Sequence, residues 1–154
     1  MFATDTMRSV GETPGADYAA YQRSLARSYC SCEEGARQPA CMALEADENV
    51  LPCEERVIND YREREEAHLE CWLYALQESA ECAARGWCSY DHEGFLTPSC
   101  PPRDQDCPQP GEAFRQDLAA CEVGIRCPNG QRILDEWLCD GRRDCLSDWD
   151  EQDC

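Results

Sequence analysis

The pattern of apolar and polar positions predicts helices separated by irregular segments. Apolar side chains recur at helical spacing over residues 17–29, and the longest such pattern covers residues 52–85. The longer segment has Pro52 near its start, glutamates in its first turn and Gly86 just past its end, as is typical of a helix. We therefore expect one short helix and one long helix of about residues 52–85.

The long segment has an apolar stripe with one interruption. Glu65 stands at a stripe position between apolar neighbours. The stripe consists of Ile58, Tyr61, Leu69, Trp72, Leu76, Ala80 and Ala83.

Elsewhere, residues 1–15 are predicted to form an extended tail. Five prolines exclude a long helix between residues 86 and 111, and a short helix is expected at about residues 112–120, with Phe114 and Leu118 on one face.

Three cysteines lie on the predicted long helix. Cys53, Cys71 and Cys82 are separated by 18 and 11 residues, so at 100° per residue they point within roughly 20° of one direction. Their separations along the axis are about 27 and 16 Å, far beyond the reach of a disulfide. Each must therefore bond a different neighbouring segment. The candidate partners are Cys30, Cys32, Cys41, Cys88, Cys100 and Cys107.

The number of cysteines changes the picture of the core. Fourteen cysteines in 154 residues, about 9%, is a density typical of small domains in which disulfides replace apolar burial. Such a count predicts an extracellular or periplasmic location, and less readily the mitochondrial intermembrane space. Structural zinc is disfavoured because the chain has only two histidines and no paired CxxC motifs.

The charge of the chain limits its partners. Acidic residues outnumber basic ones 32 to 14, giving a net charge of −18, and every basic residue is an arginine. This excess disfavours binding to nucleic acid or anionic lipid, and over residues 1–120 we interpret it as a determinant of solubility. No apolar run is long enough to span a membrane. The first 18 residues do not resemble a signal peptide, so Met1 is expected either to follow a removed signal or to belong to a chain exported by another route.

The chemistry is concentrated at the C-terminus, in the sequence CEVGIRCPNGQRILDEWLCDGRRDCLSDWDEQDC. Four carboxylates fall within twelve residues, between cysteines at 139, 145 and 154: Asp140, Asp144, Asp150 and Glu151. Confined carboxylates repel one another, and a hard cation with six or more oxygen ligands relieves that repulsion. Calcium accepts the irregular geometry of short loops better than magnesium does. The competing interpretation is a solvated acidic tail.

Residues 121–154 resemble the class A repeat of the low-density-lipoprotein receptor. Five cysteines occupy the first, second, fourth, fifth and sixth positions of that repeat: Cys121, Cys127, Cys139, Cys145 and Cys154. Ile125 and Ile133 fill its apolar positions. In the family, the first cysteine pairs with the third, the second with the fifth and the fourth with the sixth.

The resemblance implies a calcium site made of six residues. Side-chain oxygens would come from the four carboxylates, Asp140, Asp144, Asp150 and Glu151, and backbone carbonyls from Trp137 and Arg142. The likeness covers about a fifth of the chain.

The sequence departs from the family pattern in three places. Arg132 replaces the third cysteine, which leaves Cys121 without its usual partner. Because residues 1–120 contain nine cysteines, an odd number, we predict that Cys121 bonds one of them. Ser147 and Asp148 replace a common Asp-Gly pair in a turn. Arg142 and Arg143 lie inside the acidic loop, where they are expected to weaken the lysine capture for which the family is known.

No catalytic motif is present. The sequence has no GxSxG, HExxH or phosphate-binding glycine loop. His68 is interpreted as an ordinary, partly buried helix residue and His92 as part of a polar turn. No small-molecule substrate is expected.

The sequence therefore predicts a small, disulfide-rich protein in three parts. A tail over residues 1–15 precedes a mainly α-helical, disulfide-stapled domain over residues 16–120, and a calcium-binding module with little regular structure follows over residues 121–154. We expect a non-enzymatic structural or adaptor subunit of a larger assembly, acting by protein–protein interaction. The alternatives are a module that captures basic proteins through the acidic site and Trp137, and an accessory subunit of a membrane complex facing an oxidising compartment.

Overall fold

The computed structural model describes residues 13–32, 41, 48–90, 96–100, 106–145 and 147–154. Residues 1–12 of the predicted extended tail lie outside the described residues. Its last two residues, Pro14 and Gly15, already belong to the first helix. The turn expected around His92 also lies outside the described residues.

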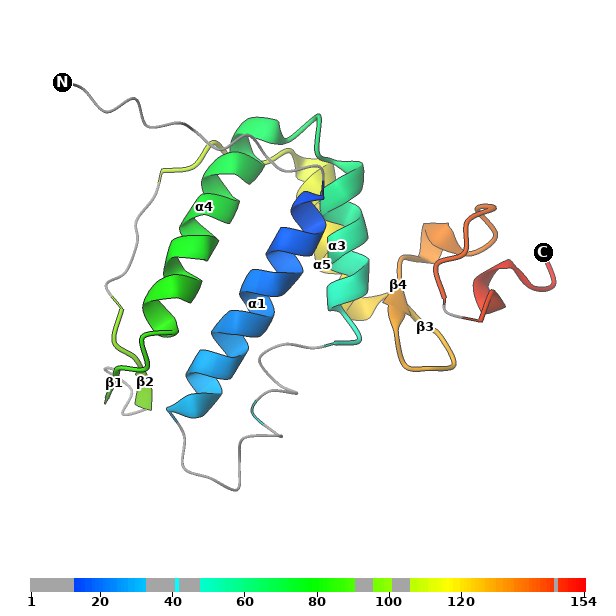
Figure 1. The fold of residues 1–154 in the computed structure, drawn as a ribbon. Coiled ribbons are helices and arrows are strands. Elements are labelled where there is room, and N and C mark those ends of the chain that lie inside the picture. Colours follow the sequence, from blue (N-terminus) through cyan, green and yellow to red (C-terminus); the bar gives the residue numbers. More distant parts are fainter. Residues whose placement is uncertain (1–12, 33–40, 42–47, 91–95, 101–105, 146) are drawn as a thin grey trace.

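Four α-helices lie within the described part of the chain (Figure 1). They are α1 (Pro14–Ser31), α3 (Leu51–Asp60), α4 (Glu66–Ala83) and α5 (Glu112–Val123). Helices α1 and α4 lie side by side and run in the same direction, whereas α3, which contacts both α1 and α5, runs in the opposite direction. The predicted helices at residues 17–29 and 112–120 are confirmed.

The prediction of a single helix over residues 52–85 is wrong. The chain turns at residues 61–65, and α3 and α4 pack beside the same helix, α1. The break falls at Glu65, the residue that interrupts the apolar stripe. Its carboxylate accepts a hydrogen bond from the backbone N–H of Gly111, with both oxygens at 3.1 Å. A straight helix would have placed this charge among apolar side chains, and the turn brings both halves of the stripe into one core.

Strands make up a small part of the described chain. Strand β1 (Cys88–Tyr90) pairs antiparallel with β2 (Leu96–Pro98), and β3 (Ile125–Arg126) pairs antiparallel with β4 (Arg132–Ile133). Two 3₁₀ turns follow, η2 (Asp135–Trp137) and η3 (Trp149–Glu151). Residues 121–154, hereafter the C-terminal segment, therefore contain little regular structure beyond the end of α5.

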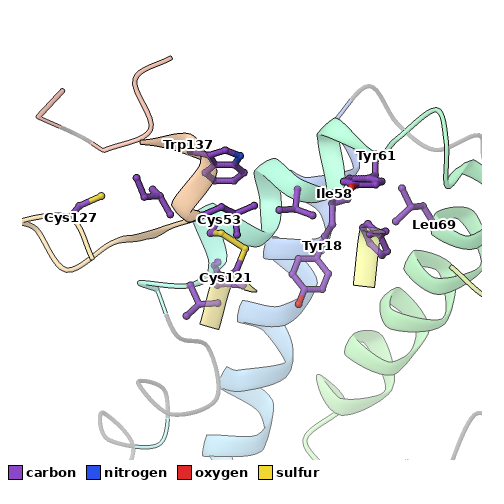
Figure 2. Close-up of a cluster of buried hydrophobic side chains, with 14 of the residues drawn as sticks. Tyr18, Cys53, Ile58, Tyr61, Leu69, Cys121, Cys127 and Trp137 are labelled. Atoms are coloured by element: carbon purple, nitrogen blue, oxygen red, sulfur yellow. A yellow bond between two sulfur atoms is a disulfide. The ribbon is translucent and has the colours of Figure 1, made fainter. Parts of the chain in front are cut away.

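One hydrophobic core continues from the helices into the C-terminal segment (Figure 2). Ile58, Leu69 and Phe114 are almost completely buried between the helices, and Ile133 and Trp137 extend the same cluster into the segment. Burial of this apolar surface is the main favourable contribution to folding. The segment is therefore packed against the helices rather than joined to them only by its chain connection.

Seven disulfides use all fourteen cysteines. They are Cys30–Cys41, Cys32–Cys88, Cys53–Cys121, Cys71–Cys107, Cys82–Cys100, Cys127–Cys145 and Cys139–Cys154. The prediction that the three cysteines of residues 52–85 bond different segments is confirmed, although Cys53 lies on α3 and not on the helix of the other two. The predicted bond of Cys121 to the preceding region is also confirmed.

Helices α1 and α3 approach each other closely at Gly15. A Cβ atom there would lie 2.1 Å from the backbone oxygen of Glu55. The Gly15 backbone N–H donates to Asn59 Oδ1 at 2.9 Å. The absence of a side chain at Gly15 therefore sets the position of α3, the helix that faces the C-terminal segment.

Candidate acidic site in the C-terminal segment

Two disulfides hold the acidic loops together. Cys127–Cys145 joins the β3–β4 hairpin to the acidic loop, and Cys139–Cys154 closes that loop around η3. Both are pairs that the resemblance to the class A repeat implies. The backbone N–H of Cys139 also donates to the carbonyl of Asp150 at 2.9 Å. These links bring the four predicted carboxylates into one small region.

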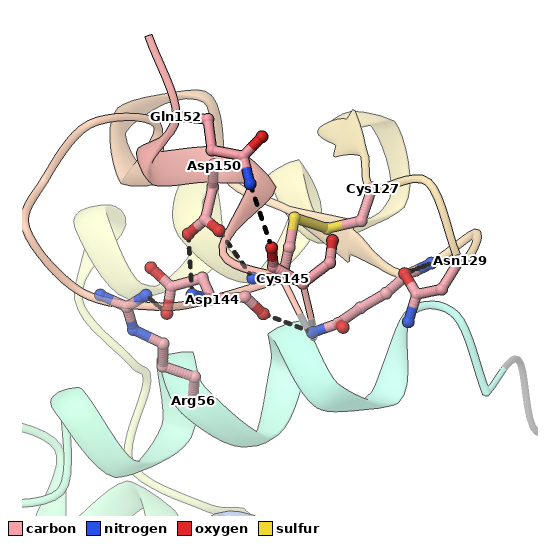
Figure 3. The surroundings of a disulfide bond; sticks show 9 residues. Arg56, Cys127, Asn129, Asp144, Cys145, Asp150 and Gln152 are labelled. Atoms are coloured by element: carbon pink, nitrogen blue, oxygen red, sulfur yellow. Dashed lines mark hydrogen bonds and ion pairs between the residues drawn. A yellow bond between two sulfur atoms is a disulfide. The ribbon is translucent and has the colours of Figure 1, made fainter. Parts of the chain in front are cut away.

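Asp150 is the most buried of the four carboxylates. It is completely inaccessible to solvent, and its two oxygens accept the backbone N–H groups of Asp144 at 2.7 Å and Cys145 at 3.2 Å (Figure 3). A buried carboxylate is tolerated when hydrogen bonds satisfy its oxygens. Asp150 thereby fixes the backbone of the preceding loop.

Asp140 and Glu151 bind backbone groups of the loop between them. The N–H of Arg142 donates to Asp140 Oδ1 at 2.8 Å, and the N–H of Gly141 donates to Glu151 Oε2 at 3.0 Å. Desolvation disfavours the charged form of Asp140, but the hydrogen bonds from Arg142 and Arg56 outweigh it, so the pKa of Asp140 is lowered. The carboxylate stays ionised well into the acid range.

The main cation at this site comes from α3. Arg56 Nη1 contacts Asp144 Oδ1 (Figure 3). Its Nη2 lies 3.1 Å from Asp140 Oδ2, and its Nε lies 3.5 Å from Asp60 Oδ2 on the same helix. Its guanidinium carbon is 3.7 Å from the centre of the Trp137 ring, a distance typical of a cation–π contact. Arg56 could not be predicted as part of the site, because nothing in the sequence places residue 56 beside residue 140.

The two arginines expected to neutralise the loop point elsewhere. Arg142 lies 3.8 Å from Asp60, and Arg143 lies 3.4 Å from Asp148; both side chains are more than half exposed. Asp148 adopts a left-handed backbone conformation with φ 52°, which aspartate tolerates better than most residues. The neutralising charge is therefore supplied across the interface with the helices, not from within the loop.

Arg132 takes a structural role where the family has its third cysteine. Its backbone N–H donates to the carbonyl of Asn49 at 2.8 Å, and its guanidinium donates to the carbonyl of Gly124 at 3.2 Å. Gly124 cannot carry a side chain, because a Cβ would lie 2.0 Å from the oxygen of Ile133. Hydrogen bonds thus connect β4 to the end of α5 while Cys121 bonds Cys53 instead.

Two carboxylate oxygens of the C-terminal segment are of the type that calcium binds. Asp144 Oδ2 and Glu151 Oε1 are buried and accept no hydrogen bond from the described residues. Oxygen atoms of this kind suit a hard cation. Among the described residues, however, no three acidic, histidine or cysteine side chains are close enough to enclose an ion, since Asp140 and Asp144 turn toward Arg56 and Asp150 toward the backbone. The donors fit calcium in type, and the calcium site stays a prediction.

His68 lies on α4 away from the acidic site. Its Nδ1 donates to the carbonyl of Pro108 at 2.7 Å, and its ring packs beside Trp72 and Phe114. This environment agrees with the structural interpretation of His68.

Comparisons with protein-family models, with curated proteins and with solved structures found no match. Within the described residues, no helix is both long and apolar enough to cross a membrane.

Proposed function

We propose that this chain is a non-enzymatic, calcium-stabilised structural or adaptor subunit of a larger extracellular or periplasmic assembly. Seven disulfides suggest an oxidising compartment. The calcium part of the proposal rests on one observation: two buried carboxylate oxygens, from Asp144 and Glu151, accept no hydrogen bond from any residue that the structure describes, in a segment whose loops are closed by disulfides. A buried carboxylate oxygen that accepts no hydrogen bond is costly, and a bound cation removes that cost.

The local charge balance supports a further cation. Of the four carboxylates predicted to bind calcium, the Arg56 guanidinium contacts two, those of Asp140 and Asp144. Asp150 and Glu151 depend on backbone N–H groups. A calcium ion that binds Asp144 Oδ2 and Glu151 Oε1, which accept no hydrogen bond from the described residues, would hold the end of the chain in place, while Arg56 keeps its contacts.

The adaptor part of the proposal is supported by exposed aromatic side chains. Trp87 and Tyr90 are each 76% exposed, at the β1–β2 end of the molecule far from the C-terminal segment (Figure 1). Large aromatic residues are enriched in the centres of protein interfaces. The helices would thus present one end to a partner while calcium stabilises the other.

Calcium binding is tested by titration calorimetry and by hydrogen exchange. Calcium is expected to bind the wild type and to slow amide exchange in residues 121–154, whereas a chelator speeds exchange there and leaves α1 and α4 largely protected. The double substitution Asp144→Asn and Glu151→Gln is expected to abolish binding. Asp153→Asn, at an exposed position of the same segment, is the matched control and binds as the wild type does. Absence of calcium-dependent protection in the wild type contradicts the proposal.

The assembly is tested by the native mass of the protein isolated gently from its source. A native mass above the 17.5 kDa of the single chain, with other protein subunits included, is expected. Recovery with integral membrane proteins would favour the accessory-subunit alternative, and recovery of the lone chain would contradict both.

A further inference from the structure

Arg56 is bound on several sides by the C-terminal segment. Its guanidinium lies over the Trp137 ring at 3.7 Å and pairs with Asp140 and Asp144, and only 14% of its side chain is exposed. An aromatic face beside two carboxylates is a site with the right chemistry for a cationic side chain. Trp137, Asp140 and Asp144 are the part of the acidic site that Arg56 contacts.

We infer that Arg56 is an internal ligand that closes the acidic site against basic groups of other proteins. The guanidinium takes the position that an arginine or lysine from a partner would need, over the Trp137 ring and within contact of the Asp140 and Asp144 carboxylates. This inference concerns the state of the site in the isolated chain. It holds whether or not the chain is a subunit of an assembly.

The surroundings of Arg56 keep it in place. It follows Cys53 by one helical turn, and Cys53 is bonded to Cys121 at the end of α5. The next two residues, Val57 and Ile58, are buried in the core. Arg56 is thus presented on a rigid helix at a high effective concentration. A basic group from another protein must compete with it for the same carboxylates.

Removal of the internal ligand is expected to expose the site. The apparent affinity of a competitor equals its intrinsic affinity multiplied by the fraction of molecules in which the site is open. If Arg56 leaves the site open in at most about a tenth of the molecules, its removal strengthens binding of an external guanidinium at least about tenfold. The external guanidinium is expected to lie over the Trp137 ring, as Arg56 does, so the gain in affinity must depend on that ring.

The experiment uses the full-length protein with calcium in excess and a short arginine-rich peptide as probe. Binding is followed by calorimetry and by the NMR signal of the Trp137 indole N–H. Arg56→Ala is expected to bind the peptide at least about tenfold more tightly than the wild type, with a shift at Trp137. Adding Trp137→Ala to this variant is expected to remove the gain. Arg115→Ala, which removes an exposed arginine paired with Glu112 on α5, is expected to match the wild type.

Two results would overturn the inference. One is a wild type that binds the peptide at Trp137 as tightly as Arg56→Ala does; the other is an Arg56→Ala variant that shows no response at Trp137. If Arg56→Ala does not fold, Arg56→Gln retains part of the stem over Trp137 and is held to the same two criteria. The calcium concentration is the same for all variants, and no partner subunit is present. A negative result for Arg56→Ala is therefore distinct from a negative calcium titration or native-mass measurement.

Discussion

The helical region and the C-terminal segment are stabilised in different ways. Between the helices, apolar side chains such as Ile58, Leu69 and Phe114 are buried and aromatic rings contact one another. In the acidic loop of the segment, a fully buried Asp150 and a set of backbone hydrogen bonds define the structure. Ile133, Leu134 and Trp137, which precede this loop, belong to the hydrophobic core shared with the helices. The comparison shows that a short chain end with few apolar residues can be ordered by charge and disulfides when a larger core lies beside it.

The interface between the two regions combines both kinds of interaction. Cys53–Cys121 joins α3 to the end of α5 within the shared core, and one turn further along α3 Arg56 reaches the carboxylates. Helix α3 is therefore the element through which the regions depend on each other. Perturbations of the disulfide, of the buried carboxylate and of the titrating groups should affect the regions unequally.

The largest effect is expected from removal of the Cys53–Cys121 bridge. Replacing both residues by alanine releases a loop with a sequence separation of 68 and should lower the free energy of unfolding by about 4 kcal/mol. Removal of Cys82–Cys100, with a separation of 18, is the control and should cost about 3 kcal/mol. Denaturant unfolding measures both, and hydrogen exchange should show that only the first change exposes the segment. Equal protection of residues 121–154 in both variants would contradict the proposed role of α3.

A smaller loss is expected from Asp150→Asn. The amide cannot accept both backbone N–H groups, and one of its own donors remains buried, so we expect a loss of about 2 kcal/mol. Amide exchange at Asp144 and Cys145 should accelerate, while exchange in α4 should change little. Asp153→Asn is exposed and should leave stability within about 0.5 kcal/mol of the wild type. Unchanged exchange at both amides would show that Asp150 does not order the loop.

Alkaline pH should affect the helical region. Burial and the neighbouring Glu54 raise the pKa of Tyr18, and the hydrogen bond to Asp117, at 2.7 Å, raises the pKa of Tyr61. The folded state thus favours the neutral phenols, so stability is fully present below the unfolded pKa of about 10 and falls as pH rises above it. Circular dichroism of unfolding across this range measures the loss. The double substitution Tyr18→Phe and Tyr61→Phe should flatten the alkaline part of the profile.

The smallest effect is expected from acid, at the contact of Arg56 with Asp140. Because the pKa of Asp140 is lowered in the folded protein, its contribution to stability is present above the ordinary value of 3.8 and is lost as pH falls through the folded pKa. The Trp137 indole signal should shift over that range. Asp140→Asn should remove this step, and its persistence in that variant would assign the step to another carboxylate.

Much of the local structure could be predicted because it depends on short-range patterns. Helices α1 and α5 follow from apolar spacing, and the bond of Cys121 follows from the odd number of cysteines before it. The single helix over residues 52–85 was a wrong prediction from the same kind of pattern. Glu65 was visible as an interruption, but its consequence depends on Gly111, 46 residues away.

The candidate site shows the same division. The sequence predicted a cluster of four carboxylates, because Cys139, Cys145 and Cys154 restrict the loops that carry them, and the calcium site they would form stays a prediction. It did not indicate Arg56, whose place beside Asp140 depends on the packing of α3, 84 residues earlier in the chain.

The sequence by itself determined the elements whose causes lie within a few residues: the periodicity of the helices, the number of cysteines and the clustering of acid groups. Only the tertiary structure decided where the long apolar segment turns, which cysteines bond and which cation meets the carboxylates. The physical reason is that helical periodicity and local charge density are short-range properties, whereas burial, disulfide pairing and ion pairing require surfaces that exist only after distant segments have packed.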